Sequence, residues 1–148
     1  MKKTLHFSVA INAPRRLVWE TMLDPEGYKE WTSAFMEGSY FSGSWEQGQA
    51  IQFRAPNGDG MASVIEENQR YEHVSIRHTG EIVAGVTDTS SDKVLAWAPA
   101  YEKYYFSDFG SATEVKVALD TVAEWENFML ETFPKSLQLL KALCERKA

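Results

Sequence analysis

The C-terminal segment carries one long amphipathic pattern that must pack against another layer of structure. From Ala123 to about Arg146, apolar residues recur at spacings of three and four, namely Trp125, Phe128, Met129, Phe133, Leu137, Leu140 and Cys144. This period is typical of a helix with one apolar face. At 1.5 Å per residue, such a helix would be roughly 36 Å long, enough to cross a small sheet. Because proline removes a backbone donor, we expect a kink at Pro134.

The preceding chain predicts strands that are apolar on one side only. Residues 3–12 alternate, and one face carries Leu5, Phe7, Val9 and Ile11. Between Tyr40 and Leu119, similar stretches recur between glycine-containing turns, with a hairpin loop expected over 57–60. One-sided strands of this kind are typical of an antiparallel sheet, because the strands of a parallel sheet are apolar on both faces.

Two short helices are expected after the first strand, and a loop interrupts the later strands. Pro14 suits the first turn of one helix, and a second one runs through Trp31, with Asp24 as its cap and Pro25 at its first position. Residues 84–99 break the strand pattern. A segment of this length is often functional, so we expect a mobile loop or lid near a cavity mouth.

Length, charge and cysteine usage narrow the function classes. The 148 residues predict a single domain spanning 1–148. The formal net charge of −6 argues against nucleic-acid binding and against docking on an anionic membrane. No apolar run approaches the ~20 residues of a membrane span. Cys144 is the single cysteine and no apolar signal-peptide core follows Met1, so we expect a cytoplasmic protein.

Two stretches of the chain resemble the signatures of a known family. Residues 13–31 read APRRLVWETMLDPEGYKEW, and residues 43–53 read GSWEQGQAIQF. Both are similar to motifs of the AHSA1-like (activator of Hsp90 ATPase homologue) family, within the START/Bet v 1-like (SRPBCC) superfamily. The resemblance implies an α+β helix-grip fold: a curved antiparallel sheet around a long C-terminal helix, with two short helices after strand 1. It also implies a cavity between the sheet and the long helix.

Candidate site residues follow from the predicted inner face. His78 shares a strand face with Val74 and Ile76, so it can bind a ligand or act as an acid or base; the alternative is a core histidine satisfied by a neighbour. With His6 and His73 it forms no metal-ligand spacing, so neither a metal nor a cofactor is expected. The cavity candidates are Trp31, Phe35, Tyr40, Phe53, Ile76, His78, Trp97, Tyr101, Trp125, Phe128, Met129 and Phe133.

Three functions are compatible with this pattern. The first is a binding protein that holds an apolar or amphipathic small molecule between sheet and helix, as a monomer or weak homodimer. The second is an enzyme of the polyketide cyclase or hydratase kind that uses the same cavity, with His78 as its one good polar candidate. The third is a chaperone partner or stress-response accessory protein, which the family resemblance implies. The absence of a familiar catalytic motif favours the first.

Overall fold

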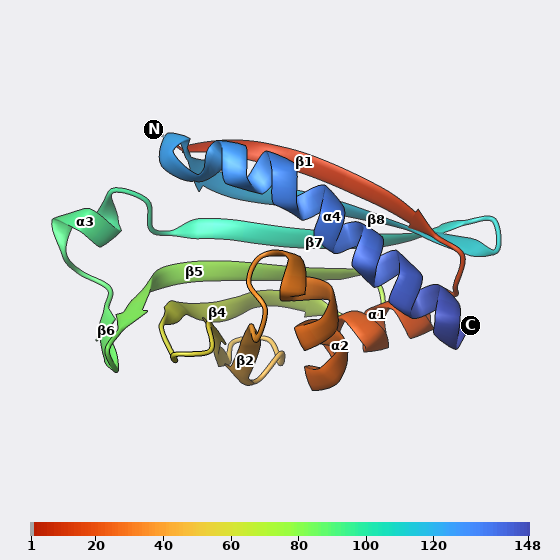
Figure 1. Cartoon of the computed structure of the whole chain (residues 1–148), viewed down its shortest axis with the longest axis horizontal. Helices are drawn as coiled ribbons and strands as arrows, with labels where there is room; N and C mark the ends of the chain where they lie inside the picture. The colour runs from red at the N-terminus through yellow and green to blue at the C-terminus, as the bar shows by residue number, and fades with distance from the viewer. Residues whose placement is uncertain (1) are drawn as a thin grey trace.

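One curved antiparallel sheet forms the frame of the molecule, and the computed structural model describes residues 2–148 of it (Figure 1). The strands follow the order β1-β8-β7-β5-β4-β3-β2, and β6 pairs with β5 off this path. Their bounds are β1 (Lys2–Ile11), β2 (Tyr40–Gly43), β3 (Ala50–Arg54), β4 (Gly60–Gln69), β5 (His73–Val83), β6 (Val86–Asp88), β7 (Ala100–Phe109) and β8 (Ala112–Val122).

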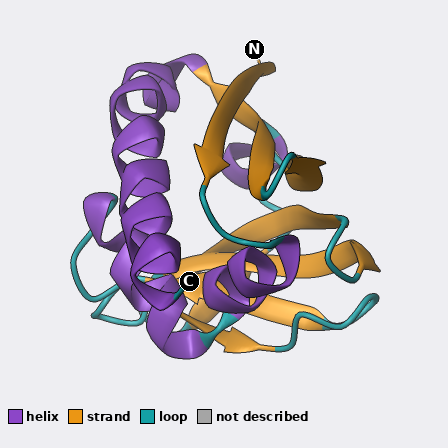
Figure 2. Ribbon diagram, turned by 90° about the vertical axis from the view of Figure 1, so that its right-hand side faces the viewer, coloured by secondary structure: helices purple, strands orange, loops and turns teal. Residues whose placement is uncertain are grey.

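Most of the helices lie on one side of this sheet, and the short α3 (Asp92–Leu95) lies at one end of it (Figure 1). They are α1 (Arg15–Leu23), α2 (Pro25–Trp31), the 3₁₀ turn η1 (Thr32–Ala34), α3 (Asp92–Leu95) and α4 (Ala123–Lys147). The Asp24 side chain caps α2 by accepting from the backbone of Glu26 and Gly27, as the sequence predicts. Figure 2 shows α4 running along one side of the sheet, with shorter helices beside its C-terminal half. The helix-grip fold predicted from the sequence is confirmed.

The strand register defines which residues face α4. Phe7 is paired with Val117, and Val117 with Tyr104, so these side chains share one face across three strands. The ring of Phe7 stacks on Phe133 of α4 at a centroid distance of 4.9 Å. That face is therefore the inner, concave one. The predicted inward alternation of β1 is confirmed, because Phe7 lies on this face and Leu5, Val9 and Ile11 are buried.

The two halves of α4 differ in burial. All buried residues of the helix lie at or after Thr132, whereas none of residues 123–131 is buried. Trp125 is 52% exposed and Phe128 is 40% exposed. The prediction that these two side chains reach inward is therefore wrong. The ring contacts explain the difference: Phe133 in the second half packs against Phe7, Phe35 and Tyr104, whereas the ring of Phe128 lies 6.4 Å from that of Phe35 and 6.1 Å from that of the exposed Trp125.

Pro134 lies within α4, which is continuous from Ala123 to Lys147. The backbone carbonyl that loses its donor there belongs to Leu130, a residue that is 46% exposed. Water can therefore satisfy this carbonyl, which explains why the helix tolerates a proline at this position.

The segment over 84–99 contains β6 and the single turn of α3. Ser91 caps α3 by accepting a hydrogen bond from the Val94 backbone at 3.3 Å. Figure 1 shows β6 and α3 at one end of the sheet, beyond β5 and β7. The mobility of this segment stays a prediction.

Candidate functional site

A continuous chain of polar side chains crosses the inner face of the sheet. His78 Nδ1 lies 2.7 Å from Ser63 Oγ, and His78 Nε2 lies 3.0 Å from Glu102 Oε1. The Tyr104 hydroxyl donates to the second carboxylate oxygen, Glu102 Oε2. The three strands β4, β5 and β7 are neighbours, and Ser63 is the register partner of His78. We call Ser63, His78, Glu102 and Tyr104 the inner polar chain.

The inner polar chain is enclosed by apolar and aromatic residues, and Glu102 is its most accessible member. The His78 side chain is 4% exposed and the Glu102 side chain 19%, while Ser63 and Tyr104 are buried. The ring of Phe53 meets the His78 ring edge-on at 5.7 Å. Every polar side-chain atom of the inner polar chain has a partner, which offsets a desolvation cost of several kcal/mol.

Two tyrosines near Glu102 keep their phenol protons. Burial raises the pKa of the Tyr104 phenol well above its usual range, and the negative charge of Glu102 raises it further. The pKa of Tyr28, which comes from α2, is raised by the same two causes in the same order. Both phenols thus stay neutral at any pH at which the protein would work. No hydrogen bond from the Tyr28 hydroxyl is formed within residues 2–148.

The hydrogen-bond pattern assigns a direction to the inner polar chain. A carboxylate only accepts, so Glu102 accepts one hydrogen bond from His78 Nε2–H and one from the Tyr104 hydroxyl. In the neutral imidazole, Nδ1 is then free to accept from the Ser63 hydroxyl. This hydroxyl–imidazole–carboxylate order resembles the arrangement that activates a nucleophile or relays a proton. Because Ser63 is buried and Glu102 is not, the carboxylate is the end that a ligand would meet.

The structure brings only some of the sequence-predicted residues together. Near the inner polar chain lie the buried Ile76 and Trp31, together with Phe53, Phe35 and Phe133. The ring of Trp31 is 6.3 Å from that of Tyr104, and the ring of Phe133 is 6.4 Å from it. These residues and His78 form one aromatic-lined surface.

Other candidates lie elsewhere. Tyr101 pairs with Arg77, and Tyr40 pairs with Arg54, so both tyrosines point to the outer face of the sheet. They are one residue out of phase with the inner face, because side chains alternate along a strand. Trp97 follows α3 and is half-buried. Trp125 and Phe128 are on the exposed half of α4, and Met129 is packed partly against the core.

Four functional candidates were missed by sequence reasoning: Ser63, Glu102, Tyr104 and Tyr28. The sequence did contain a signal for Glu102. It lies on the same strand face as Ala100, Tyr104 and Phe106, at a spacing of two residues, and these three residues are buried. A glutamate at the same two-residue spacing as buried residues is predicted to point its carboxylate toward the inner face of the sheet. Ser63 had no comparable signal, since its face depends on irregularities in the pairing of β4 with β5.

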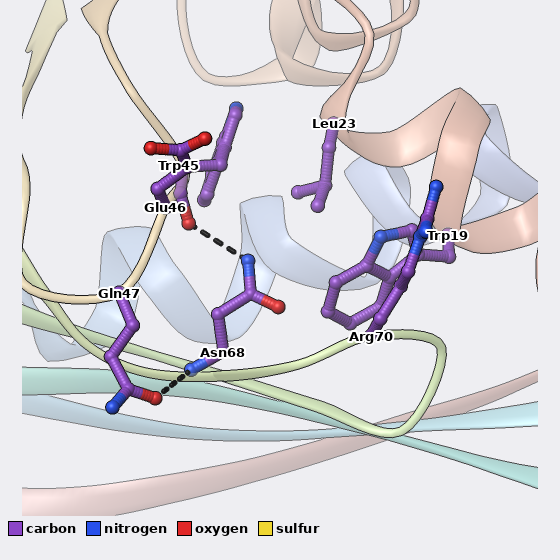
Figure 3. Close-up of a pocket in the computed structure, with 7 residues that line it drawn as sticks. All are labelled: Trp19, Leu23, Trp45, Glu46, Gln47, Asn68 and Arg70. Carbon is purple, nitrogen blue, oxygen red and sulfur yellow. Dashed lines mark hydrogen bonds between the residues drawn. The ribbon is translucent and has the colours of Figure 1, made fainter.

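Two hollows of the described residues lie away from the inner polar chain. The larger, about 470 Å³, is lined by Trp19, Leu23, Trp45, Glu46, Gln47, Asn68 and Arg70 (Figure 3). The smaller, about 270 Å³, lies over β1 and β8 and is lined by His6, Phe7, Ser8, Lys116 and Val117. None of the sequence-predicted cavity residues lines either hollow. The inner polar chain and the larger hollow share no residue and are separate sites.

Two further features concern metals and membranes. Within residues 2–148, no cluster of three or more His, Cys, Asp or Glu side chains has the arrangement of a metal site. In the same part of the chain, none of the helices combines the length and apolar character needed to cross a membrane.

Comparisons with known proteins give relatives in structure only. No family model and no curated protein sequence matches the chain. Among solved structures, MLL2253 from Mesorhizobium loti has a TM-score of 0.76 at 12% identity, and the match covers 99% of each chain. CalU16 from Micromonospora echinospora has a TM-score of 0.69 at 13% identity, over 97% of this chain and 76% of that one.

A third neighbour is the Aha1 dimer from Colwellia psychrerythraea, solved in solution. Its TM-score is 0.67 at 17% identity, and the match covers 97% of this chain and 94% of that one. At sequence identities this low, the structural similarity concerns the backbone arrangement alone. They show that the chain has the helix-grip fold.

Proposed function

We propose that this protein binds an amphipathic small molecule on the inner face of the sheet, beneath the first half of α4. One observation carries the proposal: Glu102, whose side chain is 19% exposed, stands in an apolar, aromatic surface with buried partners holding both of its oxygens. A ligand hydroxyl or amine can donate to this fixed carboxylate, while its apolar body contacts Phe53, Phe35 and Phe133. Few polar groups in an apolar surround are typical of small-molecule sites.

Entry to the inner face is proposed to occur at residues 123–131 of α4. This stretch has no buried residue, and Pro134 interrupts the backbone hydrogen bonds just after it. One ion pair, from Lys3 Nζ to Glu126 Oε2 at 3.1 Å, ties it to β1. Both partners are partly exposed, so the pair contributes at most about 1 kcal/mol. We call residues 123–131 the entry segment.

An acid–base enzyme is the second candidate function, and the order Ser63–His78–Glu102 is the observation that favours it. A substrate proton taken up by Glu102 converts the carboxylate to a carboxylic acid that can return the proton, as general acid–base catalysis requires, while His78 Nε2–H and the Tyr104 hydroxyl hold the carboxyl group in place. The fold likeness to CalU16 is compatible with either function, because fold does not determine chemistry.

The proposal is tested by thermal shift with a matched pair of probes, 2-naphthol and naphthalene. Both fit an aromatic surface, but only the naphthol donates a hydrogen bond. At ten times its dissociation constant, a ligand adds about 1.4 kcal/mol of stability, which raises Tm by about 4 °C in a chain of this size. We expect 2-naphthol to give such a shift and naphthalene a smaller one.

Glu102→Gln should abolish the difference between the two probes, since the amide keeps the shape but loses the charge. The matched control is Glu37→Gln, an exposed glutamate outside the site. The proposal is contradicted if neither probe shifts Tm, or if Glu102→Gln still prefers the naphthol. Loss of turnover with retained naphthol binding in His78→Gln would favour the enzyme.

A further inference from the structure

The larger hollow lies away from the inner polar chain, between α1, the loop that joins β2 to β3, and the end of β4. Trp19 and Leu23 come from α1, Trp45 from the loop between β2 and β3, and Asn68 from β4. Figure 3 shows these side chains arranged around one space. Its volume of about 470 Å³ falls within the range of roughly 300–1,000 Å³ that is usual for small-molecule sites. We call it the outer hollow.

The walls of the outer hollow are held in place by contacts of their own. Asn68 Nδ2 donates to the Trp45 carbonyl at 2.8 Å, and the Asn68 backbone donates to Gln47 Oε1 at 3.0 Å. These bonds fix the β2–β3 loop against β4. Trp19 is 6% exposed and meets Phe106 edge-on at 5.1 Å. A ligand would therefore bind to a preformed surface, which lowers the ordering cost.

The polar groups around the outer hollow are of both signs. Because Asn68 Nδ2 is engaged by Trp45, the carbonyl Oδ1 is the part of this amide left to accept; Figure 3 shows it directed away from Trp45 and toward Trp19. Glu46 and Arg70 supply one negative and one positive charge at the rim. The Arg70 guanidinium lies 5.2 Å from the centre of the Tyr71 ring, which restrains it.

We infer that the outer hollow binds a small zwitterion with an apolar side chain, the chemistry of a free apolar α-amino acid. The ligand carboxylate pairs with the Arg70 guanidinium, and its ammonium group donates to Glu46 and Asn68 Oδ1. The apolar side chain lies against Leu23 and the two indoles. A simple anion would meet the repulsion of Glu46, and a simple cation that of Arg70. A ligand with both charges can pair with both rim residues.

The test compares three probes of one size: L-phenylalanine, phenylacetate and phenethylamine. Titrations are followed by NMR through the indole N–H signals of Trp19 and Trp45. Exposed charge pairs contribute up to about 1 kcal/mol, so phenylalanine should bind about two- to fivefold tighter than either singly charged probe. Arg70→Gln should reduce phenylalanine binding by the same factor, and so should Glu46→Gln. Both residues are exposed, so these variants should fold.

Matched controls are Arg16→Gln and Glu37→Gln, two exposed charges outside the outer hollow, and both should leave phenylalanine binding unchanged. Glu102→Gln should also leave it unchanged, which separates this site from the inner polar chain. The inference is overturned if phenylacetate or phenethylamine binds as tightly as phenylalanine. It is equally overturned if phenylalanine leaves both indole signals unmoved, or if the rim variants bind it like the wild type.

Discussion

Both ring nitrogens of His78 are hydrogen-bonded, so this residue links the two ends of the inner polar chain. Removing the imidazole leaves the buried Ser63 Oγ and the partly buried Glu102 Oε1 without this partner. Each unpaired group costs about 1–3 kcal/mol. His78→Ala should therefore lower the free energy of unfolding by about 2–4 kcal/mol in urea denaturation. The matched control His6→Ala, at an exposed position, should change it by less than about 0.5 kcal/mol. Equal costs for the two variants would contradict this account.

Cys144 gives a second prediction at the residue scale. Burial raises the pKa of its thiol to about 11, although a hydrogen bond with Thr21 and the charge of Lys147 partly oppose the rise. Only the thiolate reacts, so at pH 8 about one molecule in a thousand is competent. Ellman's reagent at pH 8 should label Cys144 slowly in the native protein and rapidly in 6 M guanidinium. Fast labelling of the native protein would mean that the second half of α4 opens readily.

At the scale of elements, the two halves of α4 should differ in local stability. The entry segment, residues 123–131, has no buried residue, whereas seven residues from Thr132 to Cys144 are buried. Local opening is easiest where few apolar contacts are lost. Amide exchange should therefore be much faster before Pro134 than after it. Lys3→Ala, which removes the ion pair to Glu126, should speed exchange in the entry segment only. Uniform protection along the helix would exclude it as an entry route.

The elements themselves were largely predictable from the sequence, because local patterns determine them. The alternation in β1, the Asp24 cap of α2 and the length of α4 all matched the structure. Which half of α4 would be buried was not predictable, since this depends on how the curved sheet and α1 meet the helix. The alternation identified His78 as inward-facing, but its partners come from other strands. Register shifts between β4 and β5 decide that Ser63 lies opposite His78, and no local pattern encodes them.

At the scale of the whole molecule, aromatic rings fill the space around Phe133 between the sheet and α4. Phe133 is 2% exposed and contacts the rings of Phe7, Phe35 and Tyr104 at 4.9, 5.1 and 6.4 Å. A ligand on the inner face must therefore displace side chains or lift the entry segment. Since Phe133 lies on the buried half of α4 and Phe128 on the exposed half, movement of the entry segment costs less. Ligand entry and the opening of α4 should thus be one coupled event.

Two phenylalanine variants separate the entry route from the core. Phe133→Ala should cost about 3–5 kcal/mol of stability, because it creates a cavity in a packed cluster. Phe128→Ala removes a ring that is 40% exposed, so it should cost less than about 1 kcal/mol. If the entry segment controls access, Phe128→Ala should nevertheless speed 2-naphthol association in stopped-flow measurements, because the ring that rests on Phe35 is gone. Leu139→Ala, similarly exposed on the second half of α4, should leave that rate unchanged. An association rate that responds to neither variant, or equally to both, would show that ligands reach the inner face by another path.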